Sequence, residues 1–229
     1  MHQEIEPAVL YVGTPVVLVS TMNEDETPNL SPMSSAWWLG WSCMMGFDAS
    51  SKTVENLLRT KECVLNLPSV NEVSNVDRLA RLTGSNPIPV HKNRMGYQFK
   101  PNKFEIAKLT PEPAVSVGAP RVQECPIQLE ATLVNSHEFA ANDPKMLIET
   151  IAIEVRVTKV HVRTDILSET FENRIDPDKW KPLLMSFLEF FSHGEKLQRS
   201  RLAELPEENW GGRKPSLRQA TGEKSNCNK

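Results

Sequence analysis

Two alternating runs in the second half of the chain constrain the fold most strongly. Between residues 125 and 135, apolar side chains alternate with polar ones, as in a strand that buries one face. The second run keeps its apolar residues on odd positions from Ile151 to Val157 and then moves them to even positions at Val160 and Val162. Because the strand period is two, this change of parity predicts a bulge near Thr158–Lys159, of the kind that lets a sheet curl into a barrel.

The first third of the chain predicts further strands separated by short polar turns. We expect strands at Pro15–Thr21, Asn29–Trp38, Ser42–Phe47 and Glu62–Pro68, with a reversal at Asn23–Pro28. Adjacent strands joined by a polar turn favour an antiparallel meander over a βαβ unit. The expected fold is therefore mainly β, with peripheral helices.

Three helices are expected around this sheet. Thr53 is the predicted N-cap of a short helix that ends at Thr60. Ser69 and Glu72 have the spacing of a capping box ahead of a second helix. Between residues 177 and 191 the apolar side chains fall on one helical stripe, which predicts a third helix with a buried face.

Composition excludes several classes of partner. The 229-residue chain has a formal charge of −3 and a pI near 6.0, so we expect no nucleic acid as main partner. The first residues lack a signal-peptide pattern, and no apolar run approaches the ~20 residues that span a bilayer. The widely spaced cysteines favour a reducing, cytoplasmic setting. The sequence shows no metal-ligand spacing, Walker loop or GxGxxG motif.

The sharpest candidate site is formed by Ser50, Ser51, Lys52 and Thr53, at the start of an expected helix. Hydroxyl groups, an ammonium and the N–H groups of a helix start can converge on a phosphate. The alternative is a well-capped helix beside a solvated lysine. These four residues alone do not decide between the two.

Two other groups are candidates for a ligand or an interface. Ser34, Ser35, Trp37 and Trp38 follow a turn, and strand alternation would leave one indole exposed to stack on a planar ligand. Packing in the core or at a dimer interface explains the same tryptophans equally well. Arg201 is interpreted as a solvated charge, with a contact to a phosphate or to a partner subunit as the alternative.

Two longer segments, taken together, indicate a family. They read GTPVVLVSTMNEDETPNLSPMSSAWWLG at residues 13–40 and ASSKTVENLLRTKECVLNLPS at residues 49–69. This combination resembles the flavin reductase-like, FMN-binding split-barrel family, whose members include reductase components of two-component monooxygenases. The resemblance extends over about residues 9–165, and residues 180–204 are similar to a C-terminal extension found in one branch.

The resemblance implies a six-stranded antiparallel split β-barrel of Greek-key type, usually a homodimer, with FMN in a groove at or near the subunit interface. The expected organisation is one domain over residues 1–206, with a helical extension at about 177–204, and a polar tail at 207–229 that we expect to be mobile. Within the domain, the proline-rich stretch 84–120 shows no regular period and is expected to be irregular.

The resemblance also implies positions for the cofactor, which we expect to be FMN, with FAD as the alternative. The residues that it assigns to the flavin ring are Met33, Ser34, Ser35 and Ala36, with Asn66 on the following strand as a further candidate. The residues that it assigns to the phosphate are Ser50, Ser51, Lys52 and Thr53, with Arg201 as an additional candidate.

The activity that the family implies is hydride transfer between NAD(P)H and flavin, with the redox chemistry supplied by the cofactor. Many reductases of the family carry a His and a Gly in the strand that corresponds to Glu149–Val157, and this chain has neither there. Three functions stay open: a flavin reductase, with a monooxygenase as candidate partner; an FMN-binding carrier, sensor or scaffold; and a structural dimer module. We assign no catalytic residue and no metal ligand.

Overall fold

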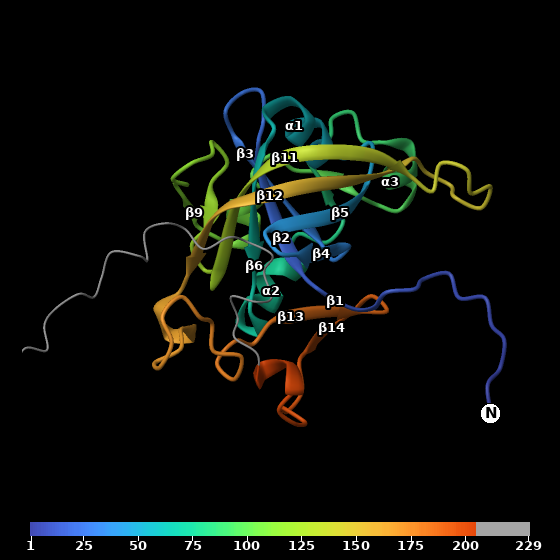
Figure 1. The fold of residues 1–229 in the computed structure, drawn as a ribbon. Helices are drawn as coiled ribbons and strands as arrows, with labels where there is room; N and C mark the ends of the chain where they lie inside the picture. The colour runs from blue at the N-terminus through green and yellow to red at the C-terminus, as the bar shows by residue number, and fades with distance from the viewer. Residues whose placement is uncertain (205–229) are drawn as a thin grey trace, which may run out of the picture.

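The computed structural model describes residues 1–204 and has one large antiparallel sheet at its centre (Figure 1). The strand order is β3-β2-β6-β11-β12-β5-β4. These strands are β2 (Val17–Met22), β3 (Pro28–Met33), β4 (Ala36–Leu39), β5 (Ser42–Asp48), β6 (Glu62–Leu67), β11 (Ile127–Phe139) and β12 (Thr150–Val162). The prediction of a mainly β fold with peripheral helices is confirmed.

The sheet curls because two consecutive strands lie at its opposite edges. β3 and β4 are the two ends of the strand order, yet Ser34 and Ser35 are the whole link between them. Such a link spans about 11 Å at most, so the two edges must approach each other. The single strand predicted over Asn29–Trp38 is thus broken at Ser34–Ser35 into β3 and β4. If these two are counted as one broken strand, the seven-stranded sheet has the six strands expected of the barrel.

The change of parity in the sequence corresponds to a bulge in β12. Glu130 pairs with Lys159 and Ala131 pairs with Val157, which leaves Thr158 as an extra residue. The bulge predicted near Thr158–Lys159 is therefore confirmed. The Thr158 hydroxyl donates to the Glu130 carbonyl oxygen at 3.1 Å, so a side chain satisfies an acceptor where the ladder is interrupted.

β2 is buried on both of its faces. Val17 and Val19 belong to a core cluster shared with residues of β5, β6, β11 and β12. Leu18, together with Val16 just before the strand, belongs to a second cluster. That cluster includes residues of α2 (Val73–Asp77) and α4 (Lys103–Ala107). Strand alternation thus divides the apolar residues of one short segment between two cores.

The helices lie around the sheet (Figure 1). α1 (Lys52–Thr60) begins slightly before its predicted start, because Ser51 and not Thr53 is the N-cap. The capping box of Ser69 and Glu72 is confirmed, and it opens a 3-10 turn that leads into α2.

The proline-rich stretch is more regular than predicted. It contains α3 (Val90–Arg94) and α4. Short strands in and around it are β7 (Leu82–Thr83), β8 (Gln98–Phe99), β9 (Pro111–Glu112) and β10 (Arg121–Val122). These elements were missed because each is too short to show a period in the sequence.

The helix predicted between residues 177 and 191 is wrong, because this segment forms a β-hairpin. The hairpin consists of β13 (Leu183–Ser186) and β14 (Glu189–Ser192). On its other side, β13 pairs with β1 (Val12–Pro15) near the start of the chain. Phe187 and Leu188 form the turn, with φ of 47° and 70°, as in hairpins whose turn follows the strand twist. The apolar residues of this hairpin fit the period of a helix or that of a strand. The segment forms strands because β1 offers it hydrogen-bond partners along its edge.

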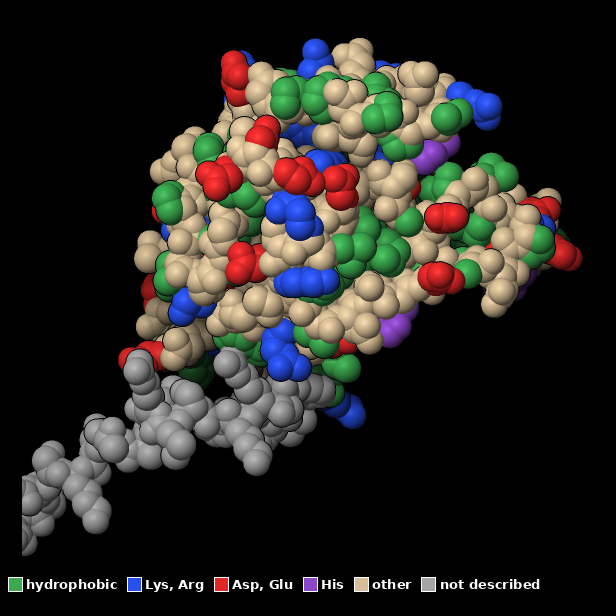
Figure 2. Space-filling view, turned by 90° about the horizontal axis from the view of Figure 1, so that it is seen from above, with side chains coloured by type: hydrophobic (Ala, Val, Ile, Leu, Met, Phe, Trp, Pro, Cys, Tyr) green, Lys and Arg blue, Asp and Glu red, His purple; other side chains and the backbone are tan. Residues whose placement is uncertain are grey.

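Near the end of the predicted helical extension, residues Arg201–Glu204 form a 3-10 turn. The predicted tail at 207–229 lies outside the described residues. Among residues 1–204, the structure has no helix of the length and hydropathy needed to cross a membrane. Figure 2 shows acidic and basic side chains interspersed over one face, in keeping with the small net charge of −3.

Glu130 on β11 anchors part of the loop that precedes β10. Its buried carboxylate accepts hydrogen bonds from the N–H groups of Val115 (2.8 Å) and Ser116 (2.6 Å), and it lies 2.7 Å from His161 Nε2. Burial alone would raise the pKa of this carboxyl, but the hydrogen bonds outweigh burial and lower the pKa from 4.5 to about 2. The charged carboxylate therefore holds the loop against the sheet.

The stability of the fold should fall in acid because of Glu130. A carboxyl whose pKa is lowered by folding contributes stability above its ordinary pKa of 4.5 and loses this contribution as the pH falls toward 2. Glu130→Gln should lower the free energy of unfolding at neutral pH by about 2 kcal/mol and flatten its acid dependence, as measured by urea unfolding. Glu138→Gln, exposed on the same strand, should behave like the native chain. Parallel acid profiles for native and Glu130→Gln protein would contradict this prediction.

Candidate functional site

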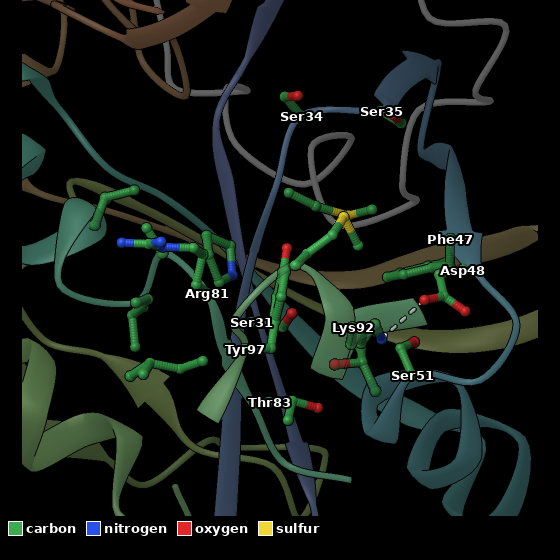
Figure 3. Close-up of a pocket in the computed structure, with 18 of the residues that line it drawn as sticks. Ser31, Ser34, Ser35, Phe47, Asp48, Ser51, Arg81, Thr83, Lys92 and Tyr97 are labelled. Carbon is green, nitrogen blue, oxygen red and sulfur yellow. Dashed lines mark ion pairs between the residues drawn. The ribbon is translucent and has the colours of Figure 1, made fainter. Parts of the chain in front are cut away.

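A cavity of about 820 Å³ lies where the break between β3 and β4 meets the start of α1 (Figure 3). Most of its lining residues come from four regions: the sheet near the break, the first residues of α1, the segment from Leu79 to Lys103, and the β13–β14 hairpin. The volume is within the range of pockets that bind cofactors and other small molecules.

The β3–β4 break forms one wall of the cavity. Met33, Ser34 and Ser35 line it, and the Gly46 N–H donates to the Ser35 carbonyl oxygen at 2.8 Å. A Cβ on Gly46 would lie 3.4 Å from the Ser35 Cβ, so this glycine lets the break pack closely against β5. Ala36 does not line the cavity, because its side chain is buried in the core.

The two neighbouring tryptophans point to opposite sides of β4, as strand alternation predicted. Trp38 packs against the core, whereas Trp37 is 58% exposed. Neither indole lines the cavity. The exposed tryptophan is therefore not placed to stack on a ligand in this cavity.

The hydroxyl residues at the start of α1 have separate roles. Ser51 and Thr53 line the cavity, and the Ser51 hydroxyl caps the helix by accepting from the Val54 N–H at 3.4 Å. The Ser50 hydroxyl instead donates to Asp48 at 2.7 Å, and Ser50 does not line the cavity. The predicted group of four is thus divided between the cavity wall and the turn behind it.

Lys52 lines the cavity, but its charge is already paired. The ammonium forms ion pairs with Glu24 and Glu55, each at 2.8 Å. Sequence reasoning missed the pair with Glu24 because it depends on the turn between β2 and β3, which folds next to α1. Lys52 can therefore offer a ligand its backbone N–H more readily than its ammonium.

Asp48, at the end of β5, connects the sheet to α3. Its carboxylate accepts from the Ser50 N–H at 2.9 Å and lies 2.7 Å from His91 Nε2 and 2.9 Å from Lys92 Nζ. Figure 3 shows the ion pair with Lys92 beside Ser51. Burial would raise the pKa of Asp48, but the hydrogen bonds from Ser50, Lys92 and His91 prevail and lower it to about 2.

The segment from Leu79 to Lys103 supplies lining residues that sequence reasoning missed. Arg81, Thr83 and Tyr97 line the cavity, and in Figure 3 Arg81 lies on the side opposite Ser51. None of these residues belongs to a recognisable motif. For Tyr97 the one available signal was the proline-rich stretch 84–120, since such segments inside a domain are often functional, whereas Arg81 and Thr83 lie just before that stretch.

Besides Ala36 and Ser50, two more of the residues assigned from the family resemblance lie outside the cavity wall. Asn66 is completely buried in β6, where its amide donates to the Leu18 carbonyl oxygen at 3.0 Å and accepts from the Val122 N–H at 2.8 Å. It therefore joins strands and does not line the cavity. Arg201 is exposed in the last 3-10 turn, also outside the cavity wall. The assigned residues that do line the cavity are Met33, Ser34, Ser35, Ser51, Lys52 and Thr53.

A comparison with known proteins identifies the family of this chain. Residues 10–191 match the model of the flavin reductase like domain. The chain belongs to this family. An uncharacterized protein of Bacillus subtilis (strain 168), YdfE, is 37% identical over 195 residues, which cover 85% of this chain and 91% of YdfE.

Among residues 1–204, no group of three or more His, Cys, Asp or Glu side chains could hold a metal ion.

Solved structures of similar fold agree with the family assignment. Flavoredoxin of Desulfovibrio vulgaris (Miyazaki F) has a TM-score of 0.70 at 21% identity, over 90% of this chain and 100% of flavoredoxin. Nitrilotriacetate monooxygenase component B from Bacillus cereus has a TM-score of 0.65 at 18% identity, over 84% of this chain and 89% of that protein. The resemblance to the flavin reductase-like split-barrel family is therefore confirmed, and membership of the family supports a flavin-related function.

Replacing Asp48 should loosen α3 from the sheet. Asp48→Asn keeps the size of the side chain but removes the charge that Lys92 and His91 contact. We expect amide exchange over residues 88–97 to accelerate by about tenfold or more and the free energy of unfolding to fall by about 2 kcal/mol. Glu55→Gln, which removes one carboxylate from an exposed ion pair, is the control and should leave exchange in α3 unchanged. Native exchange rates in Asp48→Asn would show that packing alone holds α3.

Proposed function

We propose that the chain binds FMN in this cavity and acts as an oxidoreductase that passes hydride or electrons between NAD(P)H and the flavin. One observation carries the proposal: the β3–β4 break and the first turn of α1 open into the same cavity. The first feature suits a planar polar ring, and the second suits an anion. Membership of the flavin reductase-like family supports a flavin as the ligand that has both parts.

The groups around the cavity fit this cofactor. At the start of α1, Ser51 and Thr53 lie beside N–H groups that have no acceptor within the helix, which is a suitable environment for a phosphate. At the break, Met33, Ser34 and Ser35 present backbone and hydroxyl groups next to apolar surface. The size and donor set of the cavity thus match a flavin mononucleotide.

The protein's contribution would be to position the cofactor and to exclude water. A bound flavin supplies the hydride and electron chemistry. Ser34 and Ser35 would hold the ring by hydrogen bonds, while Ser51 and Thr53 would hold the phosphate. Apolar residues of the β13–β14 hairpin, including Phe190, line the same cavity and would keep water from the ring. FAD is the alternative cofactor, and the flavin released on denaturation identifies which of the two is bound.

A flavin-binding carrier without turnover of its own is the second candidate. The observation in its favour is that the chain has neither His nor Gly between Glu149 and Val157, in β12 and the residue before it. Steady oxidation of NADH or NADPH in the presence of added FMN would favour the reductase. A yellow protein that oxidises neither nucleotide would favour the carrier.

We also propose a homodimer. The support comes from large apolar side chains on and beside the edge strand β4, since Trp37 is 58% exposed, Leu39 77% and Trp41 38%. Exposed groups of this kind mark protein interfaces. Light scattering on the purified protein measures the mass directly.

A monooxygenase is a candidate acceptor of the reduced flavin, in view of the similar fold of a monooxygenase component B.

The purified protein should be yellow and should release FMN on denaturation. Thr53→Val, which keeps the shape of the side chain but removes the hydroxyl, should weaken FMN binding by about tenfold, as measured by quenching of flavin fluorescence. Thr60→Val removes the hydroxyl at the other end of α1 and should leave the affinity unchanged. A colourless protein that takes up no added FMN would refute the proposed function.

A further inference from the structure

Lys103 is a buried cation in the wall of the cavity. The residue is 4% exposed and lines the cavity from the start of α4. Among residues 1–204, its ammonium donates to a single acceptor, Asn29 Oδ1 at 2.9 Å, and no carboxylate forms an ion pair with it. An ammonium has three donors, so two remain for a ligand.

The other lysines of the cavity wall differ from Lys103 in this respect. Lys52 is paired with Glu24 and Glu55, and Lys92 is paired with Asp48. A carboxylate that already neutralises a lysine weakens the attraction of that lysine for a further anion. Lys103 is therefore the lysine of this wall whose charge is available to a ligand.

The hydrogen bonds of Asn29 place Lys103 near the start of α1. Asn29 accepts from Lys103 with its oxygen, and its nitrogen donates to the Thr53 hydroxyl at 3.2 Å. A Cβ on Gly84 would lie 2.7 Å from Asn29 Oδ1 and 3.2 Å from the Lys52 Cβ, so the glycine keeps open the space between Asn29 and the helix. The ammonium thus lies toward the anion-binding end of the cavity.

The electrostatics of Lys103 favour a negatively charged ligand. Burial lowers its pKa, and the nearby charge of Lys92 lowers it further, to about 8. A buried ammonium without a counter-charge is costly to the folded protein. An anion bound beside it would offset this cost, and the gain would appear as affinity for that anion.

We propose that Lys103 provides the positive charge that holds the phosphate of the bound flavin, a role that the family resemblance assigned to Lys52. Asn29 acts as the positioning residue, because it orients the ammonium and the Thr53 hydroxyl with the same amide. This inference rests on the flavin function proposed above and goes further, since it names the residue that distinguishes phosphorylated from unphosphorylated flavin.

The test compares FMN with riboflavin, which has the same ring and lacks the phosphate. In Lys103→Met the dissociation constant for FMN, measured by quenching of flavin fluorescence, should rise by about tenfold or more, and that for riboflavin by less than about threefold. Lys108→Met removes an exposed lysine just after α4 and should leave both affinities at their native values. Thermal unfolding should show no loss of stability in Lys103→Met, because an apolar side chain of similar length replaces an unpaired buried charge.

The outcomes separate this inference from the proposed function. Unchanged FMN affinity in Lys103→Met, or an equal loss of FMN and riboflavin affinity, would overturn the role of Lys103 and leave flavin binding intact. A native protein that binds neither flavin would refute the proposed function itself. If Lys103→Met does not fold, Lys103→Gln, which keeps a hydrogen-bond donor but not the charge, gives the same comparison.

Discussion

The link of two residues between β3 and β4 is the constraint on which the rest of the structure depends. Because these strands lie at opposite edges of the sheet, Ser34 and Ser35 can join them if the sheet curls on itself. The bulge at Thr158 contributes to the curvature of β12. At the link the Ser35 carbonyl oxygen still accepts a hydrogen bond from Gly46 of β5, whereas the hydroxyl groups of Ser34 and Ser35 are not part of the ladder and can face a ligand.

This closure also decides what lies beside the link. β5 pairs with β4 and leads through Asp48 directly into α1, which places the start of that helix at the same cavity. Asp48 then attaches α3, a helix from a distant part of the chain, through His91 and Lys92. One carboxylate therefore joins the wall built by the sheet to the wall built by the proline-rich segment.

The three lysines of the cavity wall show how environment divides one residue type into different roles. Lys52 and Lys92 are neutralised by carboxylates, and Lys103 is buried with an amide as its acceptor. Ion pairing depends on distances of a few ångströms between side chains that the fold brings together. The charge available to a ligand is therefore a property of the folded arrangement rather than of the local sequence around each lysine.

The sequence by itself determined the features that depend on near neighbours along the chain. The alternating strands, the bulge at Thr158, the capping box at Ser69 and a short helix that ends at Thr60 all follow from local periodicity and local hydrogen bonds, although the N-cap of that helix was predicted two residues too late. The serines at the β3–β4 break were also found from sequence, because a longer motif carried them.

Only the tertiary structure decided the hairpin at β13–β14, which needed the edge of β1, and the burial of Asn66 between strands. It also decided which lysine is paired and which is not. The reason is physical: burial, strand pairing and ion pairing depend on distances through space, and no pattern along the chain contains those distances.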